Sequence, residues 1–142
     1  MGKPFEPKCL DRNLLKVFDE LNLKCFNGMV YGGIGWRKLP VRSAATYTLA
    51  ECQLLERFIG VNTLLTDRRI PMWFVRFIVY HEMLHLLLGE KPDGYGGCHN
   101  ARYMLAESRY SEYKKSVDFE ADTLPHIIET WVALRRYSSK KS

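Results

Sequence analysis

The stretch from Pro71 to Gly89, PMWFVRFIVYHEMLHLLLG, limits the fold more than any other part of the chain. It is apolar on nearly every side of a helix, and Arg76 and a short polar motif near its end are its main interruptions. A helix without a broad polar face lies inside a protein rather than on its surface. The sequence therefore predicts a buried helix over residues 71–89.

The polar motif near the end of this helix is His81-Glu82-Met83-Leu84-His85. Histidines four residues apart lie one turn apart on one face of a helix, so both imidazoles can bind a single metal ion. Glu82 stands beside them, where a carboxylate takes a proton from water instead of binding the metal. The alternative is a pair of core histidines with satisfied hydrogen bonds. Because burying such a cluster is costly without compensation, we expect one Zn²⁺ ion, bound by His81 and His85.

A catalytic zinc site needs a third protein ligand besides these two histidines. The downstream candidates are His99, Glu107, Glu112, Asp118, Glu120 and His126. His99 is favoured because it lies where a glycine-rich loop meets a predicted helix, so its ring can fold back to the ion. Glu107, two turns further along, is the alternative and would give a His-His-Glu site.

Two other local features narrow the type of site. The metzincin pattern HExxHxxGxxH is excluded, because Leu88 and Lys91 occupy its glycine and third histidine positions. Cys98, next to His99, is interpreted as a bystander and not as a ligand. His126 is assigned to the packing or the surface of the last helix.

Length and composition indicate one globular domain. The chain has 142 residues, of which 46% are apolar and 26% are charged. We expect an irregular N-terminal segment over residues 1–10, one folded domain over 11–137 and a basic tail over 138–142. We expect no signal peptide, because MGKPFEPKCL lacks the apolar region of one, and no membrane span. The four cysteines form no Cys-x-x-Cys pair, and together these features favour a cytoplasmic location with reduced thiols. The net charge of +5 permits nucleic acid as a partner, although a solvated tail is the favoured explanation of the basic residues at the C-terminus.

The remaining pattern predicts an α+β fold with a small three-stranded sheet. Helices are expected over 11–26, capped by Asp11 and ended by Asn27-Gly28, over 99–110, and over 117–137, where Pro125 bends or divides the helix. Strands are expected over 29–39, 44–50 and 58–62. Thr66 or Asp67 is expected to cap the apolar helix, with Pro71 in its first turn.

In this order the motifs resemble the SprT-like domain of zinc metallopeptidases, shared by bacterial SprT proteins and the DNA–protein crosslink protease Spartan, and are similar to the YgjP-like (WLM) metallopeptidases. The residues that carry the resemblance are Cys25-Phe26-Asn27-Gly28, Gly35-Trp36-Arg37, Ile59-Gly60-Val61-Asn62, Leu64-Leu65, His81-Glu82-Met83-Leu84-His85 and His99-Asn100-Ala101-Arg102-Tyr103. They cover about residues 11–110. The four-cysteine zinc ribbon of SprT and some of its relatives has no counterpart in the cysteine spacing here.

The resemblance implies a minimal zincin-like fold with zinc on His81, His85 and His99 and with Glu82 as general base. It implies a zinc-dependent metallopeptidase that hydrolyses peptide bonds of a protein or peptide substrate, with DNA-associated proteins among the possible targets. We expect the substrate to add as a strand at a sheet edge near residues 58–62. Tyr103, or Tyr95, is a candidate oxyanion helper.

Two other functions compete with peptide hydrolysis. HEMLHLLLG also resembles the HGxLHLxGxDH motif of YbeY-type metal-dependent endoribonucleases, which have glycine where this chain has Glu82 and histidine where it has Lys91. A non-catalytic zinc-binding domain is the other alternative. The presence of Glu82 disfavours it, because a structural zinc site needs no general base.

Overall fold

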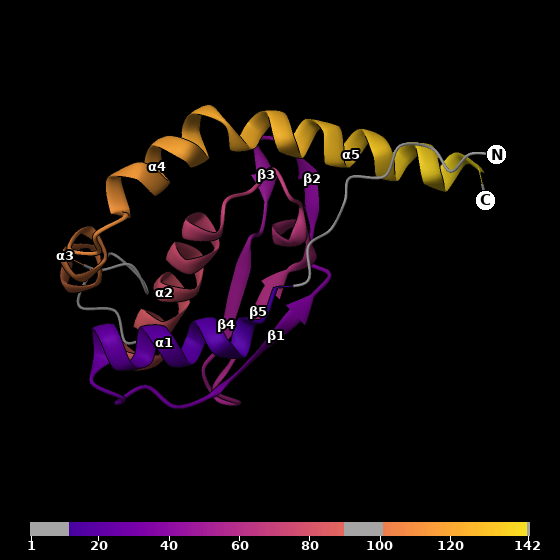
Figure 1. The fold of residues 1–142 in the computed structure, drawn as a ribbon. Coiled ribbons are helices and arrows are strands. Elements are labelled where there is room, and N and C mark those ends of the chain that lie inside the picture. The colour runs from indigo at the N-terminus through magenta and orange to yellow at the C-terminus, as the bar shows by residue number, and fades with distance from the viewer. Residues whose placement is uncertain (1–11, 90–100, 142) are drawn as a thin grey trace.

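The computed structural model describes residues 12–89 and 101–141 of the chain (Figure 1). Within them, helix α2, Met72–Leu88, packs against a small sheet and contacts helices α1 (Leu14–Phe26), α3 (Ala101–Ser108) and α4 (Tyr113–Asp122). Helices and a small mixed sheet together make the α+β architecture that the sequence predicted. No helix of the described residues is long and apolar enough to cross a membrane.

Helix α1, Leu14–Phe26, buries one side against the core. Four of its five buried residues, Leu14, Val17, Phe18 and Leu21, recur at the spacing of one helical face, and Phe26 at its end is the fifth. Asn13 caps its start, since the side chain accepts a hydrogen bond from the Lys16 amide at 3.0 Å. The predicted cap, Asp11, lies outside the described residues. Asn27 ends the helix with a φ of 51°, as the sequence predicted.

Three strands form the central sheet: β1, Gly33–Arg37; β4, Ala50–Gln53; and β5, Phe58–Asn62. Their order is β1-β5-β4, with β1 parallel and β4 antiparallel to β5. The expectation of a sheet edge near 58–62 is therefore wrong. Strand β5 is central because both of its sides pair with neighbouring strands. The two edge strands are β1 on one side and β4 on the other.

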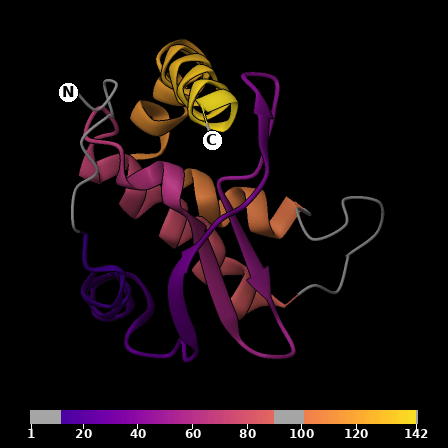
Figure 2. The ribbon, with the colours of Figure 1, turned by 90° about the vertical axis from the view of Figure 1, so that its right-hand side faces the viewer.

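The predicted strand over 44–50 is divided between two pieces of structure. A separate hairpin is formed by β2, Val41–Ser43, and β3, Thr46–Tyr47, and β4 begins only at Ala50. The hairpin reaches up to the last helix, α5 (Leu124–Lys141), at the end of the sheet (Figure 2). The glycines before β1 allow a close backbone approach, as expected, because a Cβ on Gly32 would lie 2.5 Å from the Arg57 carbonyl oxygen.

Helix α2 begins differently from the prediction. Thr66 closes a short 3₁₀ helix, η1 (Thr63–Thr66), and Asp67 accepts a hydrogen bond from the Arg69 amide instead of capping α2. Pro71 occupies the N-cap without any side-chain hydrogen bond. The segment before α2 is instead held by Arg12, whose buried guanidinium donates hydrogen bonds to the carbonyls of Leu65, Asp67 and Ile70.

The C-terminal part forms α3, Ala101–Ser108; α4, Tyr113–Asp122; and α5, Leu124–Lys141. The predicted helix over 117–137 is thus two helices, which meet at Thr123. Pro125 lies in the first turn of α5, where its missing N–H leaves no helical hydrogen bond unmade. Helices α3 and α4 pack against α2 (Figure 1).

Candidate metal centre

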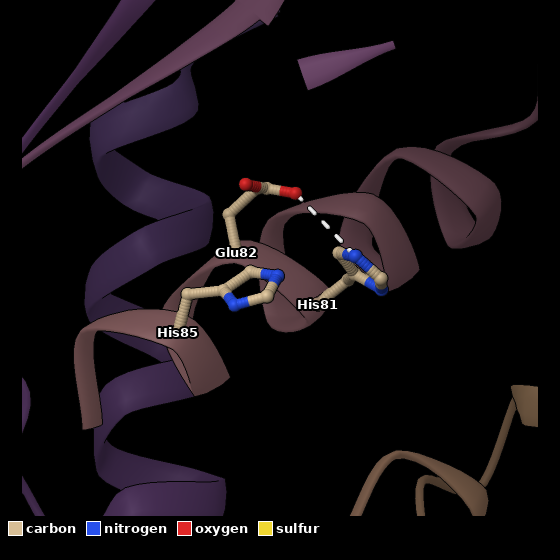
Figure 3. Close-up of side chains that lie close together, drawn as sticks. All are labelled: His81, Glu82 and His85. Carbon is tan, nitrogen blue, oxygen red and sulfur yellow. Dashed lines mark ion pairs between the residues drawn. The ribbon is translucent and has the colours of Figure 1, made fainter. Parts of the chain in front are cut away.

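The side chains of His81, Glu82 and His85 come together on the last turns of α2 (Figure 3). One potential ligand atom from each lies within 4.8 Å of the other two. The two imidazole rings have centroids 5.2 Å apart and are nearly perpendicular, at 74°. Two histidine nitrogens and a carboxylate at this spacing are a donor set that suits Zn²⁺.

This cluster is largely removed from solvent. The Glu82 side chain is 8% exposed and the His81 side chain 24%, and His85 is buried. Burial raises the pKa of Glu82 to about 7, with nearby carboxylates acting in the same direction against the opposing charge of His81. Burial alone lowers the pKa of His81, but the hydrogen bond to Glu107 and the surrounding carboxylates outweigh it, so this pKa lies above its ordinary value.

Glu107 of α3 contacts His81 from the side away from Glu82. A carboxylate oxygen of Glu107 is hydrogen-bonded to Nδ1 of His81, whereas Nε2 of His81 lies 3.6 Å from the Glu82 carboxylate. Glu107 is not a member of the His81–Glu82–His85 group. A carboxylate on Nδ1 holds the imidazole in one orientation and makes Nε2 the better metal ligand. This is the geometry of a supporting residue.

Tyr103 fastens the same helix to the site. Its hydroxyl donates a hydrogen bond to the backbone carbonyl of His81 at 2.6 Å, and its ring stacks on His85 with centroids 4.5 Å apart. One turn after Tyr103 in α3, the backbone carbonyl of Ala106 accepts a hydrogen bond from the hydroxyl of Tyr80, a residue of α2, at 3.0 Å. Helix α3 is therefore positioned by two tyrosine hydroxyls. The oxyanion role of Tyr103 stays a prediction.

A cavity of about 330 Å³ opens beside His81 and Glu82. It lies between the start of β4, helix α2 and helix α4, and its walls include Leu49, Phe77, Ile78 and Val117. Glu120 of α4 also lines it and accepts a hydrogen bond from the hydroxyl of Tyr47 at 2.9 Å. This bond joins the hairpin to α4 at the site.

The other candidates from the sequence fall into two groups. His99, Cys98 and Tyr95 lie outside the described residues. Glu112 pairs weakly with Lys115 at 3.9 Å, and His126 is exposed on α5, as expected. The contact between Tyr47 and Glu120 could not be predicted from the sequence, because 73 positions separate the two residues and no local pattern relates them.

No protein-family model matches the sequence, and no curated protein matches it.

Proposed function

We propose that this protein is a zinc-dependent metallopeptidase. The observation that supports the proposal most strongly is the convergence of His81, Glu82 and His85 within 4.8 Å on one buried helix. A buried carboxylate next to two imidazoles is costly unless a cation or a proton compensates it. The high pKa of Glu82 is a sign of that cost.

One further contact fits a zinc ion. Nδ1 of His81 is hydrogen-bonded to the Glu107 carboxylate, which is the usual support for a metal-binding histidine. Glu107 lies outside the group of converging atoms, and we therefore propose His99, and not Glu107, as the third ligand. His81, His85 and His99 would hold the ion, which when bound supplies a Lewis acid for hydrolysis of a peptide carbonyl.

Glu82 acts as the general base in this proposal. Its carboxylate faces the histidine side of the cluster and accepts a proton from the attacking water (Figure 3). After attack, the same carboxyl group donates that proton to the leaving amine. Its burial keeps bulk water from competing for the proton and favours the protonated form that this second step needs.

The sheet supplies a place for an extended substrate. In the three-stranded sheet β4 is an edge strand, as β1 is, and β4 packs against α2 and leads into the cavity beside His81. We propose that the substrate adds as a strand along β4, in a zincin-like arrangement. This replaces the position near β5 that the sequence suggested.

The deciding experiment measures proteolysis of an unfolded protein by the zinc-loaded chain, with and without DNA. Glu82→Gln should keep its zinc and lose about 10²- to 10⁴-fold in rate, because only the proton acceptor is removed. Glu129→Gln, an exposed change on α5, is the control and should retain full activity. If fully zinc-loaded wild type cleaves no protein under either condition, the proposal fails. Cleavage of RNA in its place would identify a metal-dependent endoribonuclease.

A further inference from the structure

We infer that the cavity beside His81 binds a lysine or arginine side chain of the substrate, held by Glu120. The inference rests on the proposed peptidase function and adds to it a substrate class. A pocket that touches the reacting groups selects the residue next to the cleaved bond, because that side chain has nowhere else to lie. His81 and Glu82 both line this cavity.

The shape of the cavity suits a long, unbranched side chain. Its volume is about 330 Å³, and it is bounded by apolar side chains of α2 and α4 on two sides. Phe77 and Ile78 are buried, whereas Val117 is 42% exposed at the surface of α4. The methylene groups of lysine or arginine can pack along such walls while the charged end continues to a polar group.

The charge of the cavity favours a cationic side chain. Among the described residues, three carboxylates line it, Glu82, Glu107 and Glu120, and no lysine or arginine does. This concentration of negative charge stands against a chain whose net charge is +5. Within the described residues, neither Glu107 nor Glu120 lies within 4 Å of a lysine or arginine nitrogen.

The three carboxylates are not equally available to a substrate. Glu82 is 8% exposed, makes no hydrogen bond within the described residues, and serves the catalytic step. Glu107 is engaged by His81. Glu120 is held in place by Tyr47 through one oxygen, which leaves its second oxygen for a ligand. Glu120 is thus the carboxylate that a cationic side chain meets.

Other side chains fit this cavity less well. An acidic residue would be repelled by the carboxylates at short range, where partial burial limits screening by solvent. An apolar residue would fill the walls but displace water from Glu120 without replacing its hydrogen bonds. A lysine or arginine side chain can both pack against the apolar walls and donate a hydrogen bond to the Glu120 carboxylate.

The test uses the zinc-loaded full chain and peptides of random sequence, with cleavage sites mapped by mass spectrometry. Lysine and arginine should be enriched at one fixed position beside the cleaved bond. Matched peptides with Lys, Met or Glu at that position then give kcat/KM values. Lys should exceed Met by about tenfold or more, the effect of one charge-assisted hydrogen bond.

Two changes at Glu120 and one control make the result specific. Glu120→Gln keeps an acceptor for Tyr47 but removes the charge, so kcat/KM for the Lys peptide should fall to within a few-fold of that for the Met peptide. Glu120→Lys should reverse the preference toward Glu. Asp118→Asn removes the same charge from an exposed position of α4 and should leave the preference unchanged.

The possible failures are distinguishable. Equal cleavage of the three peptides, or a Lys preference that Glu120→Gln leaves intact, overturns the inference and leaves the peptidase proposal standing. If zinc-loaded wild type cleaves no peptide, the peptidase proposal falls and the inference falls with it.

Discussion

Replacing Glu107 with alanine should weaken zinc binding without changing the number of ions bound. The carboxylate contacts Nδ1 of His81, and the two side chains are 17% and 24% exposed. A hydrogen bond to a charged group in such a partly buried setting contributes about 1.5–3 kcal/mol. At about 1.36 kcal/mol for each factor of ten, this corresponds to a loss of roughly ten- to a hundredfold in zinc affinity.

The assay is a competition titration against a chelator of known affinity, with metal content measured on the same samples. Glu107→Gln keeps an acceptor for His81 and should lose less than Glu107→Ala. His85→Ala removes a proposed ligand and should lose the most zinc affinity, whereas Glu129→Gln changes an exposed charge on α5 and should lose none. If Glu107→Ala loses zinc as completely as His85→Ala, Glu107 is a ligand. If its affinity equals that of wild type, the contact with His81 does not support the metal.

Three further predictions concern the frame around the site. Arg12→Met should lower the free energy of unfolding by about 3 kcal/mol, measured by denaturant titration, because it leaves buried carbonyls before α2 without a donor; unchanged stability would show that these bonds contribute nothing. Burial alone raises the pKa of Asp67, but hydrogen bonds from Arg69 and the charges of Arg69 and Arg12 bring it below its ordinary value. Asp67 therefore stabilises the fold above the unfolded pKa of about 3.9, and this contribution is lost as pH falls through the lower folded value. Asp67→Asn should cost about 2 kcal/mol at pH 7, and the difference from wild type should shrink below about pH 4; a difference that grows in acid would contradict this sign. Tyr103→Phe removes the hydroxyl bond to the His81 carbonyl and should cost about 1 kcal/mol with kcat unchanged, whereas a hundredfold fall in kcat at full zinc content would assign it the oxyanion role.

Features set by neighbouring residues could be predicted from the sequence. The apolar run from Met72 to Leu88 becomes a buried helix because no side of it is polar, wherever the rest of the chain lies. His81 and His85 share a face because a helix repeats every 3.6 residues. Asn27 ends α1 because asparagine tolerates a left-handed backbone. These outcomes depend on spacings of a few residues.

Errors arose where distant segments compete for the same neighbours. Strand β5 was expected at an edge, but the order of strands depends on pairing with both β1 and β4, which lie on either side of it in space. The prediction that Thr66 or Asp67 caps α2 is wrong because the Asp67 side chain is hydrogen-bonded and ion-paired to Arg69. The backbone there is held instead by hydrogen bonds from Arg12. No window of sequence around α2 contains that arginine.

The sequence by itself determined the chemistry that one buried helix can carry: two histidines one turn apart, and a glutamate next to the first of them. Only the tertiary structure decided what surrounds them. It placed Glu107 behind His81 and not among the converging ligand atoms, and it joined Glu120 to Tyr47 at a cavity beside the site. The physical reason is that helical periodicity is a local property of the backbone, whereas the partners of a buried side chain depend on how helices and strands pack across the whole chain.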